Sequence, residues 1–514
     1  MSGASEMGSL TARSNEESQF VGSSSGVYFV NTVRQAFSQN LNQSSSSSSS
    51  PSGQGCFPSP EETLVGSEDS PRDKQHVDPS SPSVVVGGDV LFLSHWKYAP
   101  AVAAQLGDAP SVDVARELMM VYFRAWHPLF PFLHGPTFLQ AMELLYAGYR
   151  GQDTTMTAPN QPPLHDHRSA CWTVILQCVF NLASLLRPDL HLPPNSQIDS
   201  PSSVYPLLGT LSCRHDLSSL QALLAAQLYL VAKMSLRTAS TVGGCILRSM
   251  LHAGLHRCPF RYKELSSHDR QLRKRIFWCA YAVDRYLSQA LGLPLGIQDS
   301  DVDVCPPGAS EVHVPGVLVH RPGKPPSKNG NQRSKDIEDQ CKREAALASY
   351  VESGKLTGRA LELFHKSILV RSIRRSTVLY LASDVHKWWN SLPRDLQSNP
   401  ISPSSSSSSS TNTNANTNSN QPFNFGPFFI VLYHHLILLI NRPFLSLAPS
   451  TPEFCSALQT CIGAARGILA ALSSQVEQGQ PLFWPGFLSA AWMSGLVLAF
   501  ACRLGQYVLG KGCQ

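Results

Sequence analysis

The stretch RKRIFWCAYAVDRYLSQALGLPLGIQDSDVDV, residues 273–304, carries the clearest helical pattern in the chain. Ser267 is a suitable N-cap for this helix, because a serine side chain accepts a hydrogen bond from the free N–H groups of the first turn. Gly292 and Pro294 end it, since glycine adopts the left-handed cap and proline cannot continue the hydrogen-bond ladder. The apolar positions recur at the spacing of one helix face and are Leu272, Ile276, Cys279 or Ala280, Val283 and Leu287. The stretch therefore predicts a helix that turns this face to a core.

Two charged residues, Asp284 and Arg285, interrupt the apolar run of this helix. A charge near a domain interior is tolerated only when it is paired and hydrogen-bonded. An acidic loop with Asp299, Asp301 and Asp303 follows the helix, and we expect it to fold back and pair with Arg285. The alternative is that Arg285 reaches solvent while the acids cap the next element.

The composition is that of a globular chain with added polar segments. The 514 residues are 42% hydrophobic and 15% charged, but they include 37 prolines and two serine tracts. We therefore expect an all-α fold, a large multi-helix domain with a disordered N-terminal segment and low-complexity loops. The net charge of +5 is spread along the chain and does not by itself indicate nucleic-acid binding. The 13 cysteines stand mostly inside apolar helical patterns, which favours buried free thiols in a reducing compartment, and no secretory signal is visible.

The pattern divides the chain into a polar N-terminal part and a helical domain. Residues 1–94 are predicted to be a mostly disordered linker with a short element at residues 20–37. Residues 95–510 are predicted to form the domain, with disordered insertions near residues 306–335 and 400–422. Helical patterns cover residues 112–126, 138–148, 169–186, 216–231, 241–254, 267–291, 336–392, 428–440, 454–472 and 487–504. Residues 481–502 lack a charged side chain, but prolines near their start favour a buried helix over a membrane span.

Four histidines stand in patterns that resemble parts of a metal or catalytic site. His127 and His134 flank a proline-rich turn without cysteines or carboxylates at ligand spacing, so we expect them to be hydrogen-bonded near helix ends. His165 and His167 lie in a polar segment that we expect to be a solvated loop, because two ligands do not close a metal site. With no catalytic motif and no four-ligand spacing, we expect no catalytic residue, no metal site and no stoichiometric zinc.

A basic face on the predicted helix over residues 267–291 is the one candidate for a substitute DNA contact that the sequence offers. Its cations are Arg270, Arg273, Lys274 and Arg275. A helix that carries charges opposite an apolar face is usually solvated or paired with acids. We therefore assign no DNA-binding residue in this chain, and the residues that bind any cofactor stay unknown.

Four motifs resemble those of a known family. They are HPLFPFLH at residues 127–134, AGLHR at 253–257, the stretch at 273–304, and YHHLILLINRPF at 433–444. Together they resemble the fungal-specific transcription factor domain, or middle homology region, of zinc binuclear cluster regulators, although Gln298 stands where an acid is common. GSSSGVYF at residues 22–29 is similar to a segment that precedes this region in such proteins. The matching positions, to which we assign structural roles, are His127, Pro128, Phe130, Pro131, His256, Arg257, Trp278, Asp284, Arg285, Pro294, Asp301, Arg442 and Pro443.

The resemblance implies a nuclear regulator of RNA polymerase II genes, with the transcription machinery or co-regulators as partners. Relatives hold two zinc ions in an N-terminal six-cysteine cluster, and that spacing does not occur in this sequence. We therefore expect no cofactor in this chain and DNA contact only through a missing head or a partner. We further expect a small-molecule effector and a second copy of this chain, in a homodimer, as partners. We expect no membrane contact.

Two alternatives to a DNA-bound regulator stay open. One is a helical interaction scaffold, or a co-regulator that senses a small molecule and has no DNA binding of its own. The other is an enzyme, which no motif supports. We expect this chain alone to bind duplex DNA weakly and without sequence preference, because its positive charge is dispersed.

Overall fold

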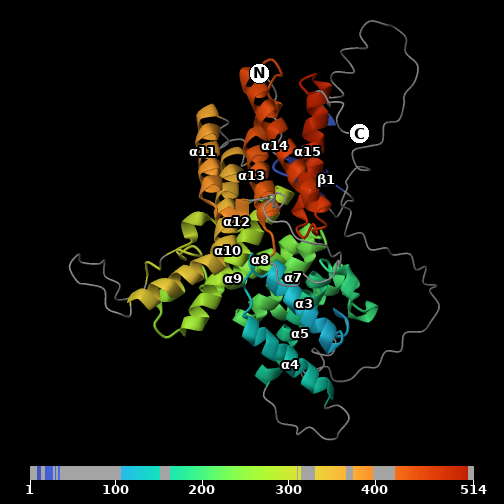
Figure 1. The fold of residues 1–514 in the computed structure, drawn as a ribbon, viewed down its shortest axis with the longest axis vertical. Helices are drawn as coiled ribbons and strands as arrows, with labels where there is room; N and C mark the ends of the chain where they lie inside the picture. Colours follow the sequence, from blue (N-terminus) through green and yellow to red (C-terminus); the bar gives the residue numbers. More distant parts are fainter. Residues whose placement is uncertain are drawn as a thin grey trace, which may run out of the picture.

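The structure, a computed structural model, describes residues 8–12, 18–26, 29–30, 33–34, 106–150, 163–309, 311–313, 330–365, 374–397 and 423–507. Over these ranges the fold is all-α apart from one short strand pair, which confirms the predicted fold class (Figure 1). The helices are α3 (Val112–Ala125), α4 (Gly135–Arg150), α5 (Pro163–Ser184), α6 (Tyr205–Leu211), α7 (Leu217–Ala232), α8 (Leu236–His252), α9 (Ser267–Leu291), α10 (Gly330–Phe364), α11 (Arg375–Ser391), α12 (Arg394–Gln397), α13 (Gly426–Asn441), α14 (Pro452–Glu477) and α15 (Gly486–Arg503). Short 3-10 turns are η3 (Pro188–Leu190), η4 (Pro194–Ser196), η5 (Pro201–Val204), η6 (Pro259–Arg261), η7 (Asp299–Asp301) and η8 (Arg442–Ser446).

The helices pack in an order that follows the chain closely. α3 packs on α5, α5 on α7, α7 on α8, and α8 on α9. α9 then packs on α10, α10 on α13, α13 on α14, and α14 on α15. Figure 1 shows α3, α4 and α5 together at one end and α11, α13, α14 and α15 side by side at the other. α9 and α10 therefore form the junction between the two halves of the domain.

α9, the central helix, has nearly the predicted bounds. Its N-cap is Ser266 rather than Ser267, because the Ser266 hydroxyl oxygen accepts the hydrogen bond from the Asp269 N–H at 3.0 Å. Its C-cap is Gly292, as predicted, with a left-handed φ of 72°. The middle of the helix is buried because α8 and α10 both pack on it.

α5 begins earlier than predicted, so His165 and His167 belong to a helix and the predicted loop is wrong. Proline is favoured in the first turn of a helix, where no N–H donor is needed, and Pro163 opens α5 in this way. His167 Nε2 lies 2.9 Å from the Ser219 hydroxyl and 3.6 Å from a carboxylate oxygen of Asp216. Asp216 is the N-cap of α7, and it accepts a hydrogen bond from the Ser219 N–H.

The long helical pattern predicted for residues 336–392 is divided between two helices, α10 and α11. Two amphipathic helices in succession give the same apolar spacing as one, which hid the division. α10 also begins at Gly330, inside the insertion expected over residues 306–335. Residues 306–309 and 311–313 of that insertion are described, and Pro307 is buried. The insertion expected at residues 400–422 lies outside the described residues.

A strand pair, β1 (Gly8–Ala12) and β2 (Ser18–Gly22), lies in the segment that the sequence predicted to be mostly disordered. The strands are antiparallel, with Gly8 opposite Gly22. Two five-residue strands contain too few alternating apolar and polar residues to be recognised within a polar linker. Of the predicted element at residues 20–37, the described part includes Phe29 and Val33, whose side chains are buried in the core. Residues 35–105 lie outside the described residues.

Three helical segments are long and apolar enough to cross a membrane by length and composition alone. They are Gly426–Ser446, Pro452–Glu477 and Gly486–Arg503. In this fold they pack on one another through α13, α14 and α15. α15 occupies the segment predicted as a buried helix: Phe487 and Val497 are buried, whereas Leu488 is exposed. Burial in the domain thus accounts for much of their apolar surface.

Candidate functional site

A buried arginine, Arg285 on α9, fixes the acidic loop that follows this helix. Its side chain is 1% exposed. One guanidinium nitrogen, Nη1, donates a hydrogen bond to Asp284 Oδ2 at 2.8 Å. The other, Nη2, donates to Asp299 Oδ1 at 2.8 Å and to the Ile297 carbonyl oxygen at 2.9 Å. The predicted pairing of Arg285 with the acidic loop is confirmed, with Asp299 as its partner, whereas Asp301 is exposed.

α10 approaches Arg285 closely because two of its residues are glycines. A Cβ atom at Gly358 would lie 3.1 Å from Arg285 Nε, and one at Gly354 would lie 3.4 Å from Arg285 Cγ. On α9 itself, the guanidinium carbon lies 4.1 Å from the centroid of the Tyr281 ring. Burial raises the pKa of the Asp284 carboxyl group above its ordinary value even with Arg285 beside it. α10 and the Tyr281 ring thus enclose the Arg285 side chain. The cost of burying its positive charge is offset by the neighbouring carboxylates.

Both ends of the acidic loop are tied to the domain at family positions. At its start, the Ser288 hydroxyl donates a hydrogen bond to the Pro294 carbonyl oxygen at 3.2 Å. At its end, the Asp303 N–H donates to the His256 carbonyl oxygen at 3.2 Å. Arg257 Nη1 lies 3.9 Å from an Asp303 carboxylate oxygen. The loop therefore connects α9 to the turn that follows α8.

The proline-rich turn after α3 inserts an aromatic side chain between the two halves. Phe130 is buried and stacks on Trp484, with 5.8 Å between ring centroids. Its edge also meets Tyr350 of α10 at 5.8 Å. Pro131 is buried and Pro128 is half-buried. The two prolines prevent a regular helix here, so the turn reaches across the junction.

The two histidines of this turn have structural surroundings. His134 Nδ1 lies 2.8 Å from the Thr137 hydroxyl, close to the start of α4, as predicted. His127 packs against Phe123, with 4.8 Å between ring centroids. Burial lowers the pKa of His127 to about 4, so its ring is neutral near pH 7. The Nδ1 atom of His127 has no hydrogen-bond partner, so the predicted hydrogen bond holds for His134 only.

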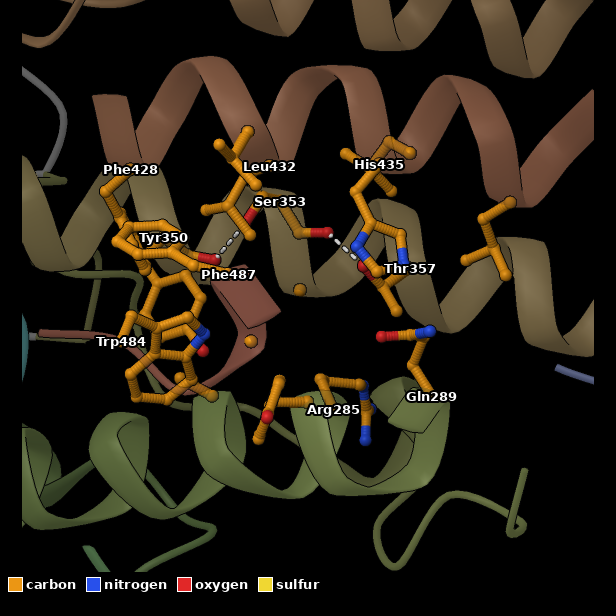
Figure 2. A pocket seen from close by; sticks show the side chains of 17 residues that line it. Arg285, Gln289, Tyr350, Ser353, Thr357, Phe428, Leu432, His435, Trp484 and Phe487 are labelled. Carbon is orange, nitrogen blue, oxygen red and sulfur yellow. Dashed lines mark hydrogen bonds between the residues drawn. The ribbon is translucent and has the colours of Figure 1, made fainter. Parts of the chain in front are cut away.

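A cavity lies at the junction, where α9, α10, α13 and the start of α15 meet (Figure 2). Its walls are mostly apolar and aromatic. The lining residues are Ala282, Arg285, Tyr286, Gln289, Tyr350, Ser353, Gly354, Thr357, Phe428, Val431, Leu432, His435, Leu436, Leu439, Trp484, Gly486 and Phe487. The cavity volume of about 50 Å³ holds a few water molecules, whereas a drug-sized ligand needs about 300 Å³. A larger ligand would have to separate the helices.

Several polar groups of the lining have no protein partner or face the open space. The hydroxyl oxygens of Tyr286 and Tyr350 are buried and lack a hydrogen-bond partner among the described residues. Figure 2 places Gln289 on α9 opposite His435 on α13, with the cavity between them. Burial, with a smaller contribution from Arg442, lowers the pKa of His435 to about 4. The cavity thus offers neutral donors and acceptors between aromatic walls, which is typical of small-molecule sites.

The N-terminal segment docks beside this cavity, at the end of α9. Gly22 and Gly292 approach so closely that a Cβ atom on Gly22 would lie 1.8 Å from the Gly292 carbonyl oxygen. The Ser24 hydroxyl donates a hydrogen bond to the carbonyl oxygen of Gln289 at 3.1 Å. Glycine is required at this contact because any side chain would overlap the backbone of the α9 cap. The backbone of a cavity residue therefore also holds the N-terminal segment.

A second buried arginine, Arg442, holds the same segment from the other side. Its side chain is 6% exposed. Arg442 Nη2 donates to the carbonyl oxygens of Ser23, Ser24 and Ser25 at 3.0, 2.7 and 3.5 Å. Burial lowers the pKa of Arg442 to about 10, so the group stays charged near pH 7. Arg442 is followed by Pro443, which is buried in the first turn of η8.

The sequence predicted the parts of this site that are close together in the chain. It identified the Arg285 pairing and marked Arg442 and the GSSSG segment as separate motifs. It did not bring Gln289, Tyr350, Ser353 and His435 together, because they lie on three helices. One sequence feature could have indicated the cavity, namely the two histidines in the otherwise apolar pattern of α13. A polar residue in such a helix often faces a cavity or a partner.

Comparisons with known proteins agree with the motifs. Residues 119–311 match the family described as "Fungal specific transcription factor domain". The chain is 44% identical to "Probable transcription factor FUP6" of Fusarium proliferatum over an alignment of 535 residues, covering 99% of this chain and 72% of that protein. It is 22% identical to "Transcriptional activator protein acu-15" of Neurospora crassa over 357 residues, covering 68% of this chain and 33% of that protein. "Activator of stress genes 1" of Saccharomyces cerevisiae is 28% identical over 185 residues, 36% of this chain and 18% of that protein. No solved structure matches.

The family match contains the centre of the site. It runs from within α3 to the loop after α9 and so includes the aromatic turn, Arg285 and Asp299. The match to the Fusarium protein extends over nearly the whole chain, including the N-terminal segment and the Arg442 motif. The chain therefore belongs to the fungal-specific transcription factor domain family, and it is a transcription regulator.

Proposed function

We propose that this protein is a nuclear regulator of RNA polymerase II genes in which a small molecule in the junction cavity controls the docking of the N-terminal segment. The observation that carries the proposal is the position of Gln289. Its side chain lines the cavity, and its backbone carbonyl accepts the hydrogen bond from Ser24. A ligand that moves the end of α9 would therefore change the contact that holds residues 22–26.

The chemistry of the lining indicates the class of effector. Tyr286, Tyr350 and Gln289 offer hydrogen-bond donors, and the His435 ring is neutral near pH 7. The guanidinium charge of Arg285 is already matched by Asp284 and Asp299. An uncharged molecule with an apolar or aromatic body and a hydroxyl or carbonyl group fits these walls best. Because the closed cavity is small, such a molecule would bind an opened form and shift the population toward it.

The remaining parts of the function follow from the family. We propose that DNA is reached through a head joined to the N-terminal segment or through a partner, and that co-regulators read the domain. A homodimer and the absence of catalysis and membrane contact are further parts of this proposal. The chain spans only 33% and 18% of the Neurospora and Saccharomyces relatives, so their whole-protein activities are not transferred to it.

The test fills the cavity without adding charge. Ser353 is 2% exposed and lines the cavity, so Ser353→Leu would occupy the space that a ligand needs. Ser456 on α14 is exposed, and Ser456→Leu is the matched control. Both variants and the wild type are fused to an unrelated DNA-binding domain and expressed in a fungal host with a reporter gene.

Reporter output is measured across a panel of carbon sources, nitrogen sources and stresses. We expect the wild type and Ser456→Leu to change by about 5-fold or more between conditions, as a coupling of about 1 kcal/mol gives. Ser353→Leu should give one constant output at a normal protein level. A response of Ser353→Leu like that of the wild type, or a wild type that never responds, would sink the proposal.

A further inference from the structure

Outside the cavity, three side chains of the kinds that bind metals come together from two separate segments of the chain, and the Glu311 carboxylate lies beside them. Cys258 precedes η6, whereas Cys305, Glu311 and His313 follow the acidic loop. The ligand atoms of Cys258, Cys305 and His313 all lie within 4.8 Å of one another. Cys305 Sγ lies 3.6 Å from His313 Nδ1, and Cys258 Sγ lies 3.9 Å from Glu311 Oε2. Both cysteines are buried free thiols.

We propose that Cys258, Cys305 and His313 form a zinc site, and that the Glu311 carboxylate beside Cys258 closes the fourth position when the ion binds. Two thiolates and an imidazole are a donor set that favours zinc over the hard cations magnesium and calcium. With zinc bonds of about 2.3 Å to sulfur and about 2.0 Å to nitrogen or oxygen, neighbouring ligand atoms of a tetrahedron lie about 3.5 Å apart. The Cys305–His313 separation of 3.6 Å and the Cys258–Glu311 separation of 3.9 Å are close to that value, and all separations among Cys258, Cys305 and His313 are within 4.8 Å.

The charges around the four residues balance when a divalent ion is bound. Lys274 of α9 is 3% exposed and forms an ion pair with Glu311 Oε1. Two thiolates, the Glu311 carboxylate, Lys274 and a zinc ion sum to zero, which a buried site requires. Binding of the ion would displace the thiol protons of Cys258 and Cys305, because the thiolate is the form that ligates zinc.

The surrounding hydrogen bonds hold both cysteines in place independently of a metal. The Cys258 N–H donates to Asp303 Oδ1 at 2.7 Å. The Trp278 indole N–H donates to the Cys305 carbonyl oxygen at 3.0 Å. A hollow with a volume of about 350 Å³ is lined by Cys305, His313 and other residues, and it gives an ion a route to the ligands. The site is thus ordered before binding and open on one side.

The proposed ion would cross-link the turn after α8 to the loop after α9. That loop carries Asp299, the partner of Arg285, so zinc would stabilise the junction from outside the cavity. The site is different in place and ligands from the six-cysteine cluster of the family. It also runs against our expectation of no bound zinc, which rested on ligand spacing along the sequence. Spacing cannot reveal a site whose first two ligands are 47 positions apart, as Cys258 and Cys305 are.

The experiment measures zinc directly on the full chain. Protein purified in a phosphine reductant is loaded with zinc, dialysed and analysed for metal content, together with Cys258→Ser/Cys305→Ser and the control Cys213→Ser/Cys455→Ser. The control replaces two exposed thiols. We expect one zinc per chain in the wild type and the control, and none in the Cys258→Ser/Cys305→Ser protein. Glu311→Gln should weaken zinc binding by about 10- to 100-fold.

A second measurement protects the test against a variant that fails to fold. X-ray absorption of the zinc-loaded wild type should show two sulfur neighbours at about 2.3 Å. Cobalt in place of zinc should give the absorption of a tetrahedral, thiolate-bound ion. A wild type without zinc, a folded Cys258→Ser/Cys305→Ser protein that keeps its zinc, or a zinc surrounded only by nitrogen and oxygen would overturn the proposal.

Discussion

Two arginines that are buried among the described residues, Arg285 and Arg442, are held in opposite ways. Arg285 is 1% exposed and pairs with the carboxylates of Asp284 and Asp299. Arg442 is 6% exposed, and its described hydrogen-bond acceptors are the carbonyl oxygens of Ser23, Ser24 and Ser25 and the sulfur of Met493. The same side chain thus makes two different kinds of anchor, one ionic and one neutral.

The difference determines what remains when each anchor breaks. Without Arg285, the half-buried Asp284 carboxylate stays in place without a counter-charge, which is costly. Without Arg442, the serine carbonyls can be rehydrated when the segment leaves, because they are neutral. The Arg285 anchor is therefore suited to holding the domain together, and the Arg442 anchor to holding a segment that is released.

The largest expected effect is that of Arg285→Ala. It should lower the free energy of unfolding by about 3–5 kcal/mol, because the half-buried Asp284 keeps the Gly296 N–H as a partner but loses its counter-charge. The measurement is denaturant unfolding followed by circular dichroism. Arg187→Ala is the control, since Arg187 makes similar hydrogen bonds to Asp189 on the surface and should leave the midpoint unchanged. An unchanged midpoint for Arg285→Ala would show that the ionic anchor is not needed.

Arg442→Ala should have a smaller effect on stability and a larger one on the N-terminal segment. We expect a loss of about 2 kcal/mol in the free energy of unfolding, the typical value for hydrogen bonds from a charged donor. Limited proteolysis with mass spectrometry should show faster cleavage between residues 13 and 34. Arg442→Lys keeps the charge and should retain part of the protection. A loss as large as that of Arg285→Ala, without faster cleavage, would contradict the proposed difference between the two anchors.

Acid should weaken the Arg442 anchor through its neighbour His435. The pKa of His435 is lowered to about 4, whereas that of an unfolded histidine is about 6.5. Between these values the unfolded chain binds more protons, so the free energy of unfolding falls as the pH falls from 6.5 to 4. At pH 5 the loss due to His435 is about 2 kcal/mol. We expect His435→Gln to remove that loss when unfolding curves at pH 7 and pH 5 are compared.

His127 provides the comparison for the acid effect, since burial also lowers its pKa to about 4. His127→Gln should likewise flatten the dependence of stability on pH. Only His435→Gln should also slow the acid-induced cleavage of the N-terminal segment, because only His435 lies beside Arg442 and the cavity. Equal protection of that segment by both variants would mean that acid acts on the whole fold and not on this anchor.

The sequence by itself determined the features that depend on neighbouring residues. Helical periodicity and the stop at Gly292 specified α9. Apolar residues that recur at each helical turn mark one face of a helix, and glycine accepts the left-handed conformation of its cap. The pairing of Arg285 was also predictable, because a charge inside an apolar pattern needs a partner and the acidic Asp299 follows 14 positions later. Local signals failed where Pro163 opened a helix instead of a loop and where two helices shared one pattern.

Only the tertiary structure decided which distant residues meet. Arg442 reaches Ser24, which is 418 positions away, and the cavity joins side chains of four helices. Cys258 and His313 come together because α8 and α9 pack side by side and return their connecting loops to one place. An apolar pattern states which face of a helix is buried, but it contains no information on the partner that buries it. Several other helices present apolar faces that could cover a given helix, and the packing of the whole domain selects which of them does.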